Sequence, residues 1–313
     1  MPVKPAAFNT RQHMISKTFE VYRYRDSYLN EVALHHHDFY EVYLFLSGNI
    51  SYSIESRNYH LIPGDLLIIS PMELHQPMFG TDNRNYERYV LWIDKSYLHQ
   101  YTQMGYDLAA CFDTKLPWHS HLIRPDRTNG QLLTNMLEQL MGEMEADELG
   151  GDLMAQTLLV QALILINRMA EKVPRQLELR DKSNSVVYEV LSYINENFSE
   201  DLSLDLLANK FFISKYHLSR EFNHLVGTSV YRYIIQKRLA VAKLLMSQGV
   251  PSTAVYQQCG FGDYSNFYRA FKSEYQISPK AFIAELKEDA LRAKEHIWEK
   301  TWIIRDTDSL QRP

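Results

Sequence analysis

Cysteine is scarce in this chain. Only Cys111 and Cys259 occur in 313 residues, far apart and in no paired spacing. This excludes a disulfide-stapled scaffold and a cysteine-based zinc site, and it is typical of a protein in a reducing cytosol. The chain also lacks a phosphate-binding glycine loop, a nucleophile elbow and a cysteine-nucleophile signature. The enzyme classes that depend on those motifs are therefore not favoured.

Long hydrophobic runs are missing as well. Residues 1–17 contain no apolar core of the kind that a signal peptide requires. The most apolar run, Leu158 to Ile166, is short and is interrupted by Gln161. A membrane-spanning helix needs about 20 apolar residues. The sequence therefore predicts no membrane partner and a cytoplasmic location.

The chain has no excess of basic charge, because its formal net charge is −5. The charge is unevenly distributed, however. Residues 186–283 carry ten Lys and Arg against eight Asp and Glu, and the rest of the chain carries 23 against 30. Residues 214–243 contain one acidic residue, Glu221, and six basic ones: Lys215, Arg220, Arg232, Lys237, Arg238 and Lys243. Phosphate contact needs a local basic face rather than a basic protein, so this segment could bind DNA or be a solvated helix face.

The predicted fold class is α+β, with two or three domains expected at this length. Short runs rich in Tyr, Val, Ile and Phe, separated by Gly-containing turns, predict an antiparallel barrel within residues 1–129. The clearest runs are 41–46, 50–54, 66–69 and 89–93. Apolar residues at three-and-four spacing then predict a helical hairpin over 130–171, which either covers the barrel or forms a dimer seam. A charged linker is expected at 172–185, an all-helical domain at 186–286 and a polar tail at 287–313.

The helical domain contains an internal sequence repeat. The segment starting at Ser214 and the segment starting at Asp263 are offset by 49 residues, so that Phe222 aligns with Phe271 and Arg220 with Arg269. In each copy a short helix and a turn precede a helix that begins after Ser214 or Asp263, both good N-cap residues. This is the pattern of a helix-turn-helix, whose second helix lies in the major groove. A plain helical hairpin is the alternative, and the fixed repeat makes it the less favoured one.

The geometry of the repeat suits a single face of duplex DNA. A helix predicted over residues 230–247 joins the copies, and eighteen residues at about 1.5 Å each span roughly 27 Å. Successive major grooves on one face lie about 34 Å apart. The outward positions predicted to reach DNA are Lys215, Tyr216, Ser219 and Arg220 in the first copy, and Tyr264, Ser265, Tyr268, Arg269 and Lys272 in the second.

Residues 186–283 resemble the AraC/XylS family of bacterial transcription regulators. The resemblance is carried by SLDLLANKFFISKYHLSREFNHLVGTSVYRYIIQKRLAVAKLLM and by VYQQCGFGDYSNFYRAFKSEYQISPKAFI, which has the family's GF turn, its F-x-R-x-F-K-like core and its closing SP-x-x-aromatic. The sequence departs from the family at Tyr256, where alanine is usual, and this affects the expected docking of the second unit. The resemblance implies base contacts by Tyr216, Ser219, Arg220, Tyr264, Ser265, Tyr268 and Arg269, and phosphate contacts by Lys215 and Lys272.

Histidines near the N-terminus resemble a cupin barrel. His35, His37 and Glu41 are separated by even numbers of residues, so a strand would turn them to the same inward face, and His75 follows a Pro-Gly-Asp turn. In cupins such residues hold Fe, Mn, Ni or Zn. The resemblance to regulators with this barrel implies instead a pocket for a small molecule, often a sugar. The expected ligand-binding residues are His35, His37, Glu41, Tyr43, His75 and Trp92.

The preferred interpretation is a ligand-responsive transcription regulator, an activator of carbohydrate-metabolism genes, with no enzymatic activity, cofactor or metal. Its expected partners are double-stranded promoter DNA, a sugar-like effector, a second copy of the chain and RNA polymerase, in the nucleoid region of a bacterial cytoplasm. Three alternatives remain: a metal at His35, His37, Glu41 and His75 in a cupin dioxygenase or isomerase fused to the DNA-binding module, a set of satisfied core histidines, and a DNA-bending protein without an effector.

Overall fold

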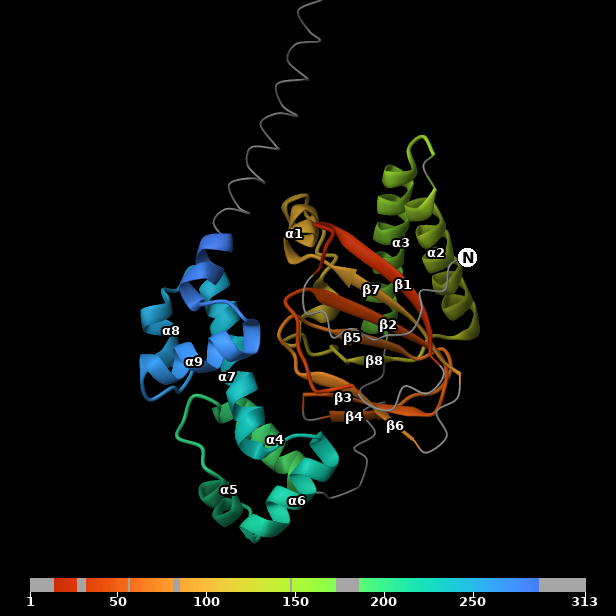
Figure 1. Cartoon of the computed structure of the whole chain (residues 1–313). Helices are drawn as coiled ribbons and strands as arrows, with labels where there is room; N and C mark the ends of the chain where they lie inside the picture. Colours follow the sequence, from red (N-terminus) through yellow and green to blue (C-terminus); the bar gives the residue numbers. More distant parts are fainter. Residues whose placement is uncertain are drawn as a thin grey trace, which may run out of the picture. The chain divides into compact units, whose positions relative to one another are not determined.

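The structure is a computed structural model that describes residues 14–26, 32–55, 57–80, 85–146, 148–172 and 186–286. Residues 1–13, nearly all of the predicted linker and the predicted tail lie outside these residues. The fold is α+β, as predicted (Figure 1). The chain divides into two compact units, residues 1–196 with 204–230, and residues 197–203 with 231–313. Each unit is described by itself, and the domain boundaries drawn from the sequence stay predictions.

Within the described residues, eight strands form two antiparallel sheets in the first unit. The larger has the order β1 (Phe19–Asp26), β7 (Tyr86–Ile93), β2 (Tyr40–Ser47), β5 (Leu66–Ile69) and β8 (Leu122–Ile123). The smaller has the order β4 (Arg57–His60), β3 (Ile50–Ile54) and β6 (His75–Phe79). The predicted strands at 50–54 and 66–69 match in full. Strands β4 and β6 were not singled out, because their polar residues and Pro77 weaken the strand pattern.

Side chains alternate along β7 between two separate cores. Tyr89, Leu91 and Ile93 join a cluster that includes the helices of the hairpin. Val90 and Trp92 belong instead to a cluster formed by residues of both sheets. The period-2 geometry of a strand therefore gives the larger sheet two buried faces, one toward the helices and one toward the barrel interior.

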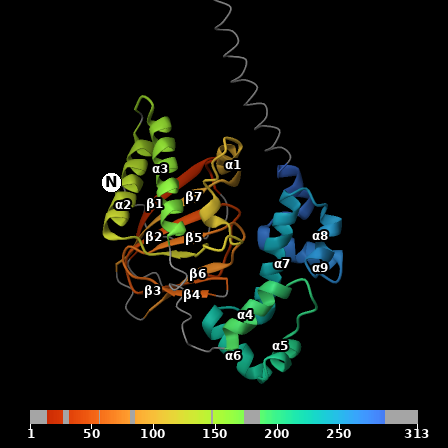
Figure 2. The same ribbon diagram turned by 180° about the vertical axis from the view of Figure 1, so that it is seen from behind.

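The predicted hairpin is present as α2 (Arg127–Glu145) and α3 (Gly151–Glu171). Its helices pack against each other and lie along one face of the larger sheet, as Figures 1 and 2 show from opposite sides. Helix α3 is long and apolar enough to cross a membrane by length and composition alone. Its residues Leu159, Leu163 and Ile166 are fully buried in the sheet-facing core, which explains that composition. The hairpin therefore covers the barrel, and its role in dimerisation stays a prediction.

Shorter helical elements complete the unit. Helix α1 (Lys95–Gln103), which the sequence patterns did not single out, begins after Asp94, whose carboxylate accepts hydrogen bonds from two backbone amides. The 3-10 turn η1 (Ala110–Phe112) follows it. Beyond residue 185 come α4 (Val186–Asn197), α5 (Leu204–Lys210) and α6 (Lys215–Val226). Helix α5 is the short helix that the sequence predicted before the one that begins after Ser214.

The second unit is helical in the described part of the chain. Helix α7 (Val230–Ser247) begins at the boundary and has the predicted ends, and α8 (Ser252–Gln258) and α9 (Tyr264–Tyr275) follow. Leu239, Val255, Phe267 and Phe271 are fully buried in their common core. Residues 279–286 form a further helix.

The turn between α8 and α9 depends on Gly260. Its φ is +77°, and an added Cβ would lie 2.5 Å from the Ser199 backbone oxygen. We expect Gly260→Ala to lower the free energy of unfolding by more than the roughly 1–2 kcal/mol that left-handed backbone costs an L-residue. Gly249→Ala is the matched control, because Gly249 has φ +92° with no atom within 4 Å of the added Cβ. Urea unfolding of both variants would refute this packing if their losses were equal.

Candidate functional site

Helix α6 is the second helix of the first helix-turn-helix, the one predicted to enter the major groove, and is called the first reading helix. It has the surface expected for that role. The Ser214 hydroxyl caps it by accepting a hydrogen bond from the His217 backbone N–H at 3.2 Å. Leu218 and Phe222 are fully buried and hold the helix to its unit. The predicted DNA-facing side chains of this helix are all exposed: Lys215, Tyr216, Ser219 and Arg220.

The two cations of α6 have only surface partners. Lys215 Nζ lies 2.6 Å from Asp205 Oδ1, and Arg220 Nη2 lies 3.0 Å from Glu221 Oε1, with side chains at least one-third exposed. Such exposed pairs contribute about 0–1 kcal/mol. Both cations can therefore exchange these carboxylates for a phosphate or a guanine edge at little energetic cost.

Helix α9 presents a partly different surface. Asp263 caps it by accepting from the Asn266 backbone N–H at 2.7 Å, and Ser265, Arg269 and Lys272 are exposed, as predicted. Tyr264 and Tyr268 were expected to be free to reach DNA, but both are half-buried.

The half-buried ring of Tyr264 packs against the unusual residue Tyr256. The Tyr256 ring meets the Tyr264 ring edge to face, with centroids 5.9 Å apart. Tyr264 in turn lies 5.9 Å from Phe267 and 6.3 Å from Tyr268. The bulky side chain that departs from the family pattern thus packs against the first residue of α9.

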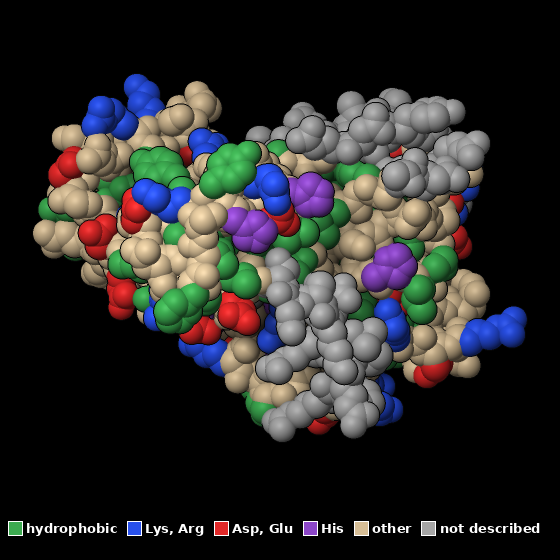
Figure 3. All heavy atoms as spheres, turned by 90° about the horizontal axis from the view of Figure 1, so that it is seen from below, with side chains coloured by type: hydrophobic (Ala, Val, Ile, Leu, Met, Phe, Trp, Pro, Cys, Tyr) green, Lys and Arg blue, Asp and Glu red, His purple; other side chains and the backbone are tan. Residues whose placement is uncertain are grey.

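Two arginines of the basic stretch have structural partners. Arg238 donates to the backbone oxygens of Phe198 and Glu200 at 2.7 and 2.6 Å. Arg232 pairs with Glu274 at 2.8 Å, and the Glu274 side chain is only 10% exposed. The charge count of the sequence therefore overestimated the cations open to DNA. On the face seen in Figure 3, Lys and Arg side chains lie scattered among hydrophobic and acidic ones.

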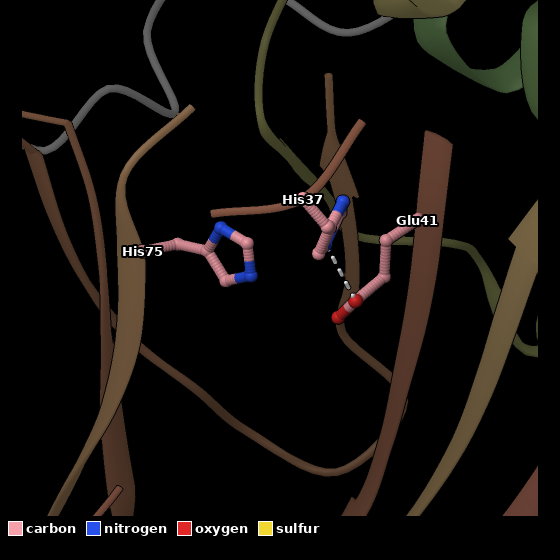
Figure 4. A group of neighbouring side chains, drawn as sticks. All are labelled: His37, Glu41 and His75. Carbon is pink, nitrogen blue, oxygen red and sulfur yellow. Dashed lines mark hydrogen bonds and ion pairs between the residues drawn. The ribbon is translucent and has the colours of Figure 1, made fainter. Parts of the chain in front are cut away.

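The second candidate site is inside the barrel, where the structure brings the predicted histidines together. His35 and His37 precede β2, and His35 is joined to His75 of β6 by two backbone hydrogen bonds. One ligand atom each from His37, Glu41 and His75 lies within 4.8 Å of the others. Figure 4 shows the His75 ring facing the His37–Glu41 pair.

Burial and hydrogen bonds set the charges of this cluster. Burial lowers the pKa of His35 to about 4, and burial followed by the neighbouring His35 and His37 holds the pKa of His75 well below its ordinary value. Burial alone would raise the pKa of Glu41, but the bonded His37, nearby His35 and the Trp92 N–H hold it below its ordinary value. At neutral pH the cluster therefore offers the neutral imidazoles of His35 and His75 and the carboxylate of Glu41, groups that suit a divalent transition metal.

Trp92 and Tyr43, the two predicted pocket walls, have polar partners. Trp92 Nε1 donates to Glu41 Oε2 at 2.9 Å, so Trp92 belongs to the histidine cluster. The Tyr43 and Tyr86 hydroxyls lie 2.5 Å apart, and the Tyr52 ring is 5.0 Å from Tyr43. The six residues predicted to bind the ligand therefore lie together in the barrel interior.

The sequence interpretation missed several interior residues. Phe39 stacks on His37 with ring centroids 3.9 Å apart, and Arg88 forms a fully buried ion pair with Asp26 while lying 4.0 Å from the Tyr86 ring centre. Tyr86 and Arg88 could have been found, because they share the even positions of β7 with Trp92. Phe39 could have been found in the same way, because it too lies an even number of residues from His35, His37 and Glu41.

Fold and sites together define a helix-turn-helix DNA-binding protein with an N-terminal ligand-binding barrel. The family model described as "AraC-like ligand binding domain" matches residues 18–163, and the model described as "Helix-turn-helix domain" matches residues 207–285. The chain belongs to the AraC/XylS family of transcription regulators.

The chain is also similar to individual proteins. The chain is 25% identical over 253 residues to the HTH-type transcriptional activator RhaS of Salmonella heidelberg. This match covers 79% of this chain and 85% of that protein. Among solved structures, the C-terminal domain of the response regulator yesN from Fusobacterium nucleatum is 31% identical over 30% of this chain and 94% of its own, with a TM-score of 0.30. ToxT from Vibrio cholerae is 12% identical over 85% of this chain and 98% of its own, with a TM-score of 0.33. TM-scores this low say nothing about function.

The DNA interface can be tested at one arginine of each reading helix. We expect Arg220→Ala and Arg269→Ala each to weaken specific binding by about 1–3 kcal/mol, because both remove an exposed cation suited to a guanine edge. Arg127→Ala, at an exposed arginine of α2, is the matched control and should leave binding unchanged. DNase footprint titration on the natural operator measures the effect. An unchanged footprint for either reading-helix variant would refute the predicted docking.

Proposed function

We propose that this chain is a cytoplasmic transcription activator whose two helix-turn-helix units bind promoter DNA and whose barrel senses a small polar molecule. The observation that carries the proposal is the pairing, in one chain, of exposed reading helices with a buried interior rich in polar groups. A buried carboxylate, imidazoles and tyrosine hydroxyls are costly unless they have a structural or ligand-binding use. The activating direction is taken from the printed name of RhaS.

A carbohydrate or related polyol is the effector class that the interior suits. Burial raises the pKa of Tyr86 to about 12 and that of Tyr43 well above its ordinary value, so both hydroxyls stay protonated and can donate as well as accept. Sugar hydroxyls need both roles, and sugar faces stack on rings such as Trp92 and Tyr52. Catalysis is not part of the proposal, and the reported relatives with named functions are regulators, which supports this.

A second copy of the chain is the expected partner of the hairpin. Although α2 and α3 cover the sheet on one side, large apolar side chains remain exposed on them: Leu132, Met144, Leu149, Leu153, Met154 and Ile164. Leu149 lies in the turn between the two helices and the others lie on the helices themselves. Apolar side chains of this number on one helical hairpin favour a protein contact. RNA polymerase is proposed as the further partner from the activating role alone.

Effector binding can be tested by thermal unfolding with a panel of monosaccharides, polyols and sugar acids. We expect at least one compound to raise the melting temperature and to change the affinity for operator DNA, because an effector must bind two states of the protein unequally. Tyr43→Phe should reduce the response. The matched control is Tyr89→Phe, which removes a hydroxyl bonded to Glu138 on the other face of the same sheet. If no compound shifts either quantity, the effector role is wrong.

A further inference from the structure

The imidazoles inside the barrel are oriented by backbone hydrogen bonds. His35 Nδ1 lies 2.9 Å from the Ala33 oxygen, His37 Nδ1 lies 2.9 Å from the Phe39 oxygen, and His75 Nδ1 lies 2.8 Å from the Glu73 oxygen. A carbonyl oxygen only accepts, so each Nδ1 must carry the proton. In the neutral rings the lone pair is therefore on Nε2. Metal-bound histidines are held in the same way, with the other ring nitrogen donating to a backbone carbonyl.

The Nε2 atoms of His37 and His75 lack a suitable donor. His75 is fully buried, and its Nε2 has no hydrogen-bond partner among the described residues. His37 Nε2 lies 3.0 Å from Glu41 Oε2, which already accepts from Trp92 Nε1. With its proton on Nδ1, a neutral His37 ring places one acceptor directly against another. Buried acceptors in this arrangement need a second proton on the ring or a cation between them.

A cation satisfies all of these acceptors together, whereas a second proton on His37 leaves His75 unsatisfied. The ligand atoms of His37, Glu41 and His75 lie within 4.8 Å of one another, and the His35 ring centre is 4.3 Å from that of His75. Donors around a tetrahedral ion with bonds of about 2.1 Å are roughly 3.4 Å apart. Binding therefore needs the side chains to move together by only about 1 Å.

We propose that His37 and His75, through Nε2, and Glu41, through its carboxylate, bind one divalent late first-row transition-metal ion. Two imidazole nitrogens and one carboxylate oxygen favour an ion from the iron-to-zinc range over magnesium or calcium, which prefer oxygen donors. The ion would be part of the effector site, a role that rests on the proposed function. The sequence interpretation preferred a metal-free pocket formed by the same residues.

The wild-type protein provides the first test and needs no variant to fold. Full-length protein is stripped with a chelator, dialysed and titrated separately with Zn²⁺, Ni²⁺ and Co²⁺ by calorimetry, with mass spectrometry of the metal content after gel filtration. We expect close to one ion per chain, and visible absorption bands of Co²⁺ bound to nitrogen ligands. Protein that retains no ion after gel filtration and shows no such bands would overturn the proposal.

Conservative variants locate the ion. His37→Gln, His75→Gln and Glu41→Gln should each weaken metal binding by about 100-fold or more. Losing a residue that only supports a metal ligand costs about 10–100-fold, and loss of a ligand itself should cost at least as much as the upper value. His119→Gln is the matched control. His119 Nδ1 also bonds a backbone oxygen, that of Cys111, at 2.9 Å, and its Nε2 is also buried without a partner, but it lies outside the three-ligand group. Equal losses in the control, or unchanged binding in the cluster variants, would place the ion elsewhere and refute the assignment.

Operator binding by the same preparations separates this proposal from the proposed function. Stripped protein that binds its operator and responds to an effector, yet takes up no ion, would remove the metal site and leave the regulator role intact. Protein that binds one ion at these residues but gives no effector response would support the metal site and count against effector sensing. Circular dichroism of each variant confirms that a lost ion does not reflect a lost fold.

Discussion

The alternation of side chains along β7 is the constraint on which the N-terminal unit depends. Tyr89, Leu91 and Ile93 belong to the core beneath the helical hairpin, whereas Tyr86, Val90 and Trp92 belong to the core of the barrel interior. A shift of one residue in register would exchange Leu91 with Trp92 and bury the indole N–H under α3, away from Glu41. Hairpin packing and the chemistry of the interior are therefore fixed by the same strand pairing.

The two candidate sites differ in how they are built. The DNA interface uses exposed side chains on short helices whose ends are set by local caps, Ser214 and Asp263. The barrel interior uses buried groups whose orientation is set by neighbouring backbone carbonyls and by residues far apart in the sequence. Rigid polar groups preorganise a ligand site, whereas exposed long side chains adapt to the groove that they meet.

Much of this architecture could be predicted from the sequence, and the features that could not be predicted share a physical cause. Helix bounds in the repeat were accurate because caps, apolar spacing and turn glycines all act within a few residues. The meeting of His37, Glu41 and His75 was foreseen from a family resemblance and even spacing. Patterns could not show that Arg238 is bonded to Phe198 and Glu200, or that Trp92 donates to Glu41, because pairing across the fold leaves no local periodicity. The half-burial of Tyr264 had the same origin.

The contact between Tyr256 and Tyr264 shows that a residue outside the predicted DNA-facing surface of α9 can contact a residue within it. Tyr256 lies on α8, outside the predicted reading helix, yet its ring packs against Tyr264, the first side chain of α9. Recognition of the second half of an operator can thus diverge between related regulators through a substitution that touches no nucleotide. Alignments restricted to base-contacting positions would assign such proteins the same preference and miss the change.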